Sequence, residues 1–150
     1  MAGESGTRLP AAAGAAVGVN LDRVNPPELA RPSGFSHVVV APAGRTAYLA
    51  GQTAQDATGQ IIDGDIVEQF EQALGNLLTA LAAAGGEPDH LTSVTVYIVD
   101  MAAYRERARD IGEVWKRLVG RDYPAMAGIG VARLWDDAAL VELQGSAALP

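Results

Sequence analysis

Residues 65–86 read DIVEQFEQALGNLLTALAAAGG and predict an amphipathic helix. Asp65 can cap its start by accepting a hydrogen bond from a backbone N–H group that would otherwise lack a partner. Gly85 and Gly86 favour its end. The apolar residues that recur at helical spacing are Ile66, Phe70, Ala73, Leu77 and Leu81. One face of this helix is therefore expected to cover a hydrophobic core.

Segments of alternating side chains lie on both sides of this helix and predict strands. After the helix, residues 91–99 (LTSVTVYIV) alternate between an apolar and a more polar face. The apolar face carries Val94, Val96 and Ile98. Before the helix, residues 36–40 and 46–50 flank the glycine-containing stretch APAGR, which predicts a hairpin.

The last third of the chain predicts a second helix and two further strands. Asp100 can cap the helix, and the glycine of VGRD ends it. Its apolar face carries Tyr104, Ala108, Ile111, Trp115 and Leu118. The strands are expected at 126–133 and 140–147. The order ββαβαββ indicates an α+β fold in which two helices cover one face of a mixed sheet.

The stretch YPAMAGIGVARL, residues 123–134, raises the question of what covers the other face. The residues expected on its core side are Ala127, Ile129 and Val131. Met126, Gly128 and Gly130 would then lie away from the helices, beside Glu142 and Gln144 of the last strand. Glycine within a strand often marks the close approach of a ligand or of another backbone. We therefore expect a second copy of the chain against this face.

The composition argues against several classes of function. The formal net charge of -7 disfavours a nucleic-acid backbone or an anionic membrane as the main partner. The chain has no cysteine, which excludes disulfides, thiolate nucleophiles and cysteine–metal sites. With His37 and His90 as the only histidines, no metal site is expected. No apolar run is long enough to predict a transmembrane helix, and a reducing cytoplasm fits this composition.

The length of 150 residues suits one domain. Residues 1–30 are rich in alanine, glycine and proline and are expected to form a flexible arm before a single domain over 31–150. No glycine-rich phosphate loop follows a strand and opens a helix, and no G-x-S-x-G motif is present. We therefore expect neither a nucleotide cofactor nor a serine nucleophile of the hydrolase type.

From Gly34 to Ala148 the chain resembles the Rid family, also called YjgF or RidA-like. The matching segments, in the family's order, are FSHVV, LAGQTAQDATGQIIDGDI, EQALGNLLTALAAAG, LTSVTVYIVDMAAY, YPAMAGIGVARL and LVELQGSAA. The resemblance implies a chorismate-mutase-like fold and a homotrimer whose sheets form a central barrel, with clefts between the subunits. It also implies a deaminase that hydrolyses reactive imines and enamines, such as 2-iminopropanoate, without a cofactor.

The resemblance further implies a set of cleft residues, several of which depart from the deaminase pattern. Glu142 matches the glutamate that helps to position water, and Gly51-Gln52 match the family's Ala-Gly-Gln turn. Met126 stands where an arginine grips the substrate carboxylate, and methionine offers no donor to replace it. The other departures are Phe35 for tyrosine, Ala108 for asparagine and Gly128 for cysteine. These changes all describe a more apolar cleft, with Glu142 as the catalytic residue.

Three functions are consistent with such a cleft. The first is an enzyme that hydrolyses an imine or enamine, or transfers a proton or eliminates a group, on a small organic molecule without a carboxylate at the usual place. Such an enzyme would be a poor 2-iminopropanoate deaminase. The second is a non-catalytic binder of a small apolar ligand. The third is a structural trimer with a vestigial cleft, in which Glu142 is a solvated or ion-paired sheet residue.

Overall fold

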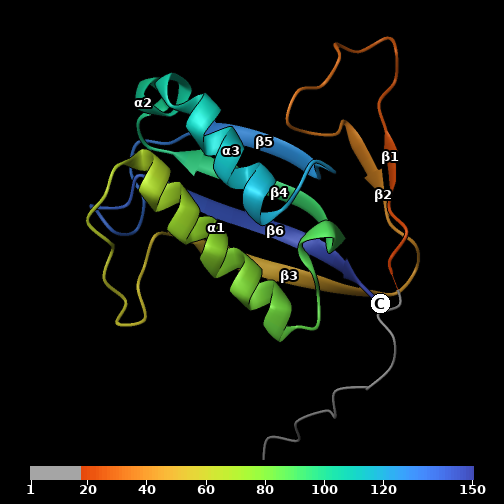
Figure 1. Ribbon diagram of the computed structural model, residues 1–150, viewed down its shortest axis with the longest axis horizontal. Helices are drawn as coiled ribbons and strands as arrows, with labels where there is room; N and C mark the ends of the chain where they lie inside the picture. Colours follow the sequence, from red (N-terminus) through yellow and green to blue (C-terminus); the bar gives the residue numbers. More distant parts are fainter. Residues whose placement is uncertain (1–17) are drawn as a thin grey trace, which may run out of the picture.

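Helix α1 (Ile66–Ala83) lies across a four-stranded sheet in the computed structural model, which describes residues 18–150 (Figure 1). The first 17 residues of the predicted arm lie outside the described residues. The strands are β1 (Asp22–Val24), β2 (Val38–Val40), β3 (Arg45–Gln52), β4 (Leu91–Ile98), β5 (Ala125–Gly130) and β6 (Val141–Leu149). The other helices are the 3₁₀ turn η1 (Pro88–His90), α2 (Met101–Glu106) and α3 (Ala108–Leu118).

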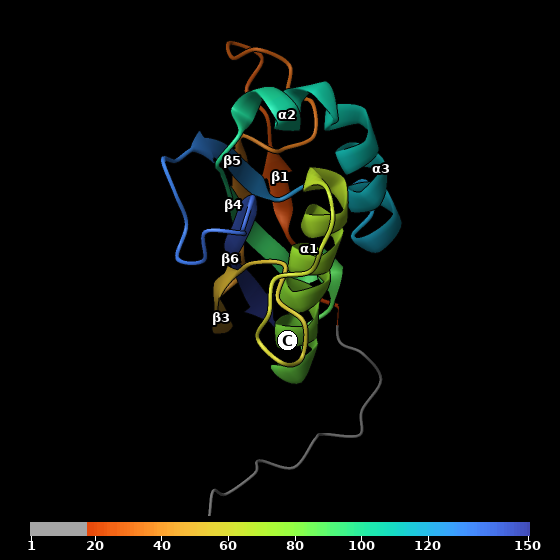
Figure 2. The same cartoon turned by 90° about the vertical axis from the view of Figure 1, so that its left-hand side faces the viewer.

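The main sheet has the strand order β3-β6-β4-β5. Strand β6 runs antiparallel to both β3 and β4, whereas β4 and β5 are parallel, so the sheet is mixed as predicted. Helices α2 and α3 form the connection between the two parallel strands, which a hairpin turn cannot join. Seen along the sheet in Figure 2, α1 and α3 lie on the same side of it.

The apolar face of α1 forms the centre of the core. All five residues predicted for this face are buried, with exposed fractions of 5% or less. They pack against the inward side chains of the two central strands, which are Val94, Val96, Ile98, Val141 and Leu143. Each fully buried leucine or phenylalanine contributes about 1.5–3 kcal/mol relative to an exposed one, so burial of this layer stabilises the domain.

Asp65 caps α1 as the sequence predicts. Its carboxylate accepts hydrogen bonds from the N–H groups of Val67 and Glu68, each at 3.0 Å. The Glu68 carboxylate accepts one from the Asp65 N–H at 3.0 Å, which completes a capping box. At the other end Gly85 has a φ of 88°, a left-handed conformation that lets the chain leave the helix at low cost.

The second predicted helix is present in two parts that meet at Arg107. Asp100 caps α2 by accepting a hydrogen bond from the Ala103 N–H at 3.0 Å. Arg107 has a φ of -101° and a ψ of 15°, so the helical geometry is interrupted before α3 begins. Of the predicted apolar face, Ile111 and Trp115 are buried, Tyr104 and Leu118 are partly buried, and Ala108 is exposed. The prediction that Ala108 faces the core is therefore wrong.

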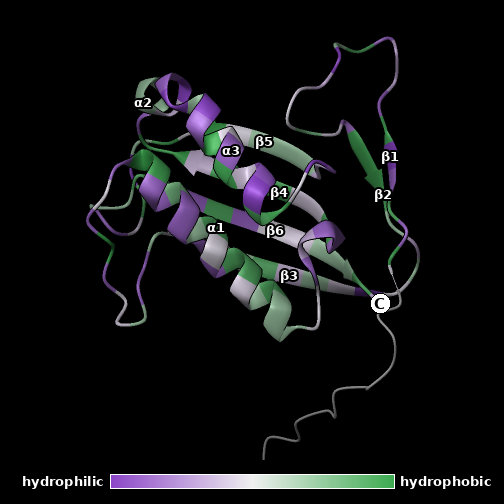
Figure 3. Ribbon diagram, in the orientation of Figure 1, coloured by the Kyte–Doolittle hydropathy of each residue, from purple (hydrophilic) through white to green (hydrophobic). Residues whose placement is uncertain are grey.

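The predicted hairpin around APAGR is also wrong, because β2 pairs with β1 and not with β3. Ser36 explains the difference. Its N–H donates to the Pro124 carbonyl at 2.9 Å, and its hydroxyl donates to the Tyr123 carbonyl at 2.7 Å. These bonds hold the chain beside the start of β5, at the opposite edge of the sheet from β3. Strand β2 is apolar throughout (Figure 3) and, with β1, forms a separate two-stranded sheet.

No described helix covers the face of the main sheet opposite α1 and α3, which we call the uncovered face (Figure 2). The register of the strands places on it Tyr48, Ser93, Thr95, Tyr97, Ala127, Ile129, Glu142 and Gln144. Two of these are large and exposed, since Tyr48 is 86% and Ile129 44% accessible to solvent. Within residues 18–150, no helix is both long and apolar enough to span a bilayer.

Candidate functional site

Glu142 lies near the start of β6 on the uncovered face. Its neighbours Val141 and Leu143 are fully buried on the helix side, so strand alternation directs the Glu142 side chain the other way. It is opposite Tyr97 of β4 in the antiparallel register. Among the described residues, no arginine, lysine or histidine forms an ion pair with it. The carboxylate is therefore available to exchange a proton with a ligand.

Gly51 provides the space in which the Glu142 carboxylate lies. A Cβ atom on Gly51 would be 1.9 Å from Oε1 of Glu142 and 2.9 Å from its Cδ. Gly51 sits in an irregularity of β3, where the register with β6 shifts between Leu49 and Gln52. Its φ is not positive, so glycine is needed here for room and not for backbone conformation. Gly51 and Glu142 thus form one structural unit.

Polar side chains extend from this unit along the uncovered face. The Tyr97 hydroxyl donates to Oε1 of Gln144 at 3.3 Å. Gln52 is not on this face, because it is opposite Leu143 in the register, and its amide donates to the Ala50 carbonyl at 3.4 Å. Further along, the Ser93 and Ser146 hydroxyls are 2.8 Å apart. The side of the sheet that holds Glu142 can therefore bind water or a small polar group through several hydroxyls and the Gln144 amide.

The prediction that Met126, Gly128 and Gly130 line the uncovered face is wrong. In the parallel register Met126 is opposite Val94 and Gly128 is opposite Val96, both buried on the helix side. Directly opposed residues of adjacent strands share a face. Met126 accordingly packs against the hydrophobic core. The residues of β5 on the uncovered face are Ala127 and Ile129.

A Cβ atom would fit at both strand glycines against side chains of their own subunit. A Cβ atom on Gly128 would be 3.7 Å from Cδ1 of Ile98, and one on Gly130 would be 3.6 Å from Cε of Met101. Both distances are ordinary van der Waals contacts. These glycines therefore face the layer between β5 and the helices, and they give no evidence of another chain on that side.

The remaining predicted cleft residues lie apart from Glu142 within one chain. Phe35 is partly buried before β2, and its ring packs edge to face against the His37 ring, with 5.1 Å between the ring centroids. Ala108 is exposed at the start of α3. Of the predicted cleft residues, one chain places only Gly51 against Glu142, and Gln52 follows Gly51 at the end of β3 with its side chain on the helix side. A shared cleft that also includes Phe35, Ala108, Met126 and Gly128 stays a prediction about an assembly of chains.

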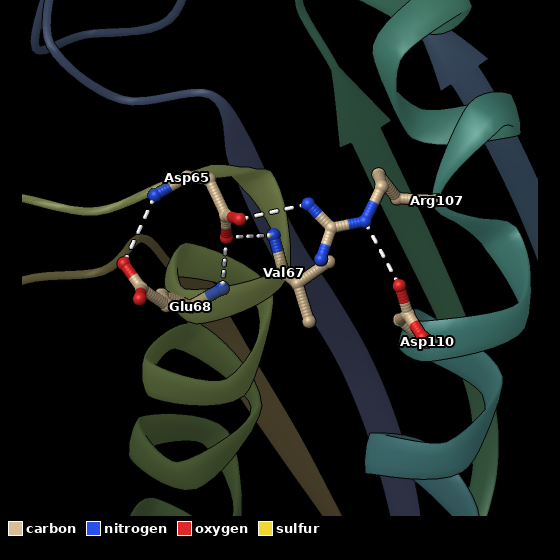
Figure 4. A network of polar contacts seen from close by, with 5 residues as sticks. All are labelled: Asp65, Val67, Glu68, Arg107 and Asp110. Atoms are coloured by element: carbon tan, nitrogen blue, oxygen red, sulfur yellow. Dashed lines mark hydrogen bonds and ion pairs between the residues drawn. The ribbon is translucent and has the colours of Figure 1, made fainter.

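A polar network around Arg107 was not predicted from the sequence (Figure 4). Its guanidinium bonds to Asp65 at 2.8 Å and to Asp110 at 2.9 Å. These two carboxylates raise the pKa of Arg107, with Asp110 contributing most. The Glu68 N–H and Arg107 hold the pKa of Asp65 below its ordinary value. Because Arg107 joins the start of α1 to the α2–α3 junction, we assign this network a structural role.

One group of side chains has the composition of a metal site, namely Glu87, Asp89 and His90. The Glu87 N–H donates to Nδ1 of His90 at 3.0 Å, so the neutral imidazole carries its proton on Nε2. Nε2 then points a hydrogen toward Asp89, 3.8 Å away, and offers no lone pair to a cation. This arrangement orders the turn before β4 and does not favour metal binding.

Comparisons with known proteins agree with this fold. The chain is 36% identical over 106 residues to a RutC family protein of Pyrococcus horikoshii, across 70% of this chain and 80% of that protein. It is 35% identical over 91 residues to 2-iminobutanoate/2-iminopropanoate deaminase of Mus musculus, across 60% of this chain and 64% of that protein. The crystal structure of a Yersinia pestis protein of unknown function, from the conserved Rid protein family, has a TM-score of 0.78 and 32% identity, and the match covers 87% of this chain and 99% of that one.

A family model described as endoribonuclease L-PSP matches residues 27–149, which include the whole of the four-stranded sheet and the helices that cover it. Together with the relatives above, this match shows that the chain belongs to the Rid family, which the family model describes as endoribonuclease L-PSP.

Proposed function

We propose that this protein is a small-molecule enzyme of the Rid type that hydrolyses an imine or enamine, with Glu142 as its general acid and base. The observation that carries the proposal is the Glu142 carboxylate lying against Gly51 on the uncovered face, with no cation paired to it among the described residues. The likeness to 2-iminobutanoate/2-iminopropanoate deaminases supports this class of reaction.

Hydrolysis of a protonated imine requires three proton transfers that one carboxylate can perform. Glu142 would take a proton from a water molecule as the water oxygen bonds to the imine carbon, which gives a neutral carbinolamine. The protonated Glu142 would then deliver that proton to the carbinolamine nitrogen. As the C–N bond breaks, Glu142 takes the hydroxyl proton, so the products are a carbonyl compound and ammonia and the step balances without a cofactor. A positioned acid–base group of this kind contributes about 10²–10⁴-fold to the rate.

Met126 argues for a substrate other than 2-iminopropanoate. Methionine cannot pair with a carboxylate, and in this chain its side chain packs against the core beside Val94. Loss of a charge-assisted pair costs roughly 2–4 kcal/mol, or about 30- to 1,000-fold in kcat/KM. We therefore propose a substrate whose reactive carbon is not flanked by a carboxylate bound at residue 126. A reducing cytoplasm would suit such an enzyme, because the chain has no cysteine.

We further propose that the uncovered face is buried in a homotrimer and that the cleft lies between subunits. Exposed Tyr48 and Ile129 on a sheet face without helices support burial against another copy. Ile129→Arg should then convert the trimer to smaller species in multi-angle light scattering, whereas Thr79→Arg, an exposed change on α1, should not. A wild-type protein that is monomeric at micromolar concentration would contradict this proposal.

Ammonia release from imines tests the catalytic proposal. An amino-acid oxidase can generate a panel of imines in situ, and ammonia can be measured with and without the protein. Glu142→Gln should reduce the acceleration at least about 100-fold without changing the oligomeric state, because the amide cannot exchange the proton. Glu113→Gln, an exposed change on α3, serves as the matched control. If a ligand binds but the wild-type protein accelerates no ammonia release that Glu142→Gln could abolish, the protein is a binder and not an enzyme.

A further inference from the structure

A groove lined by arginines lies beside the start of β5, at the opposite end of that strand from Glu142. Its volume is about 410 Å³, and Arg23, Arg31 and Arg121 all line it. Among residues 18–150, Asp122 is the only carboxylate on its wall. Three guanidinium groups and one carboxylate leave a local excess of positive charge, although the whole chain has a net charge of -7.

Hydrogen bonds fix the walls of this groove. Arg23 donates from Nε to the Tyr123 carbonyl at 3.1 Å and from Nη2 to the Asp122 carbonyl at 3.3 Å. Ser36 bonds to the same turn through its hydroxyl. The Asn25 side-chain oxygen accepts from the His37 N–H at 2.8 Å, which leaves its amide nitrogen free to donate. A guanidinium has five N–H donors, so Arg23 keeps three for a ligand after these two bonds.

Two of the arginines have no acidic partner in the described part of the chain. Neither Arg31 nor Arg121 forms an ion pair with a carboxylate of residues 18–150. Both are exposed, so their guanidinium planes are accessible from solvent. Guanidinium groups bind planar carboxylates and phosphates through paired, charge-assisted hydrogen bonds. The groove thus combines a fixed wall with two arginines available for an anion.

We propose that this groove binds the anionic group, a carboxylate or a phosphate, of a small molecule. The fixed Arg23 and the Asn25 amide would orient the ligand, while Arg31 and Arg121 would neutralise its charge. Asp122 opposes binding and keeps the affinity moderate. The anion site does not depend on the catalytic role of Glu142. By register, Glu142 lies four residues along the strand direction and two strands across from the start of β5, roughly 16 Å away.

Titration calorimetry of the full-length protein at low salt tests this site. Inorganic phosphate and pyruvate are titrated separately, which distinguishes a phosphate from a carboxylate as the preferred group. Arg121→Gln should raise the Kd of the anion that binds about tenfold. Asp122→Asn should lower that Kd, because the change removes a negative charge and keeps the backbone carbonyl that Arg23 binds. Arg133→Gln, which alters an exposed arginine in the loop between β5 and β6, is the matched control.

The opposite signs of the two changes make the result specific. Loss of affinity in Arg121→Gln with a gain in Asp122→Asn, at unchanged melting temperature, supports the anion site. Equal affinity of all variants, or no heat with either anion, overturns it. A short single-stranded RNA that binds far more tightly than phosphate, and loses affinity in Arg121→Gln, would also overturn it by showing that the groove serves a nucleic-acid backbone.

Discussion

Gly51→Ala tests the contact on which the proposed catalytic site depends. The new Cβ atom would be 1.9 Å from Oε1 and 3.2 Å from Cγ of Glu142. Approaches closer than 3.0 Å do not occur for real Cβ atoms, so one of the two groups has to move. The backbone of Gly51 has no positive φ and accepts alanine, and the carboxylate is the mobile end of a side chain. We therefore expect Glu142 to leave its position while β3 stays in place.

The size of the effect follows from this geometry. Holding Glu142 in a less favourable rotamer costs about 0.5–1.5 kcal/mol. Alanine restricts the unfolded chain more than glycine does, and this raises the free energy of unfolding by about 0.4–1 kcal/mol. The free energy of unfolding should therefore change by only about 1 kcal/mol or less. Activity should fall about 100-fold or more, because the displaced carboxylate no longer meets the substrate.

A double-mutant cycle separates the clash from any other effect of the alanine. Urea unfolding of Gly51→Ala, Glu142→Ala and the double variant is followed by tryptophan fluorescence at one protomer concentration. Without the carboxylate the alanine should stabilise the fold by about 0.4–1 kcal/mol, so the two changes should not be additive. Additivity within about 0.5 kcal/mol, or wild-type activity in Gly51→Ala, would refute the proposed contact.

Three further predictions concern stability and titration. Gly86→Ala should lower the free energy of unfolding by about 1–3 kcal/mol, because its Cβ would be 2.3 Å from Cδ1 of Leu81 and 2.9 Å from Cδ2 of Leu149. An unchanged midpoint of urea unfolding would contradict this packing. Hydrogen bonds from N–H groups of α1 and from Arg107 lower the pKa of Asp65. The stability that the Asp65 carboxylate contributes is therefore present above about pH 4 and is lost on acidification. The melting temperature of Asp65→Asn should accordingly fall less at acid pH than that of the wild type. Burial raises the pKa of Tyr104 to about 12 from 10.0. The unfolded chain therefore loses this proton at a lower pH than the folded one, and the free energy of unfolding should fall as the pH rises between these values. The last step in the tyrosinate absorbance during an alkaline titration should vanish in Tyr104→Phe.

The sequence predicts those helices and strands whose own apolar and polar residues alternate clearly enough to identify the buried face. Helix α1 shows all five expected core residues, and its Asp65 cap forms as expected. Strands β4 and β6 alternate clearly, and Glu142 lies on the predicted side of the sheet. In each case the side chains themselves specify which face is buried, so no knowledge of distant partners is needed.

Strand β5 and the start of the domain depend on partners that the local sequence does not reveal. Strand β5 consists mainly of alanine and glycine and is pale along most of its length in Figure 3, so neither face has a strong hydrophobic preference. Its parallel register with β4 decides that Met126 faces the helices. Likewise, Ser36 bonds to a turn 87 residues away, and this contact separates β2 from β3. A one-residue error in register exchanges the faces of a strand.

Because Met126 of β5 faces the helices, its apolar side chain is explained by packing within its own subunit. Methionine there packs against the core of its own subunit, and the groove that holds exposed arginines lies beside the start of β5, around Arg121. One chain therefore holds its candidate acid–base group and its candidate anion site roughly 16 Å apart, too far for one small substrate to contact both. Either the two sites act on different molecules, or a neighbouring copy brings one chain's groove to another chain's Glu142. Kinetics of Arg121→Gln distinguish these arrangements. A joint site requires that kcat/KM falls with the loss of anion affinity, whereas separate sites require that turnover at Glu142 is unchanged.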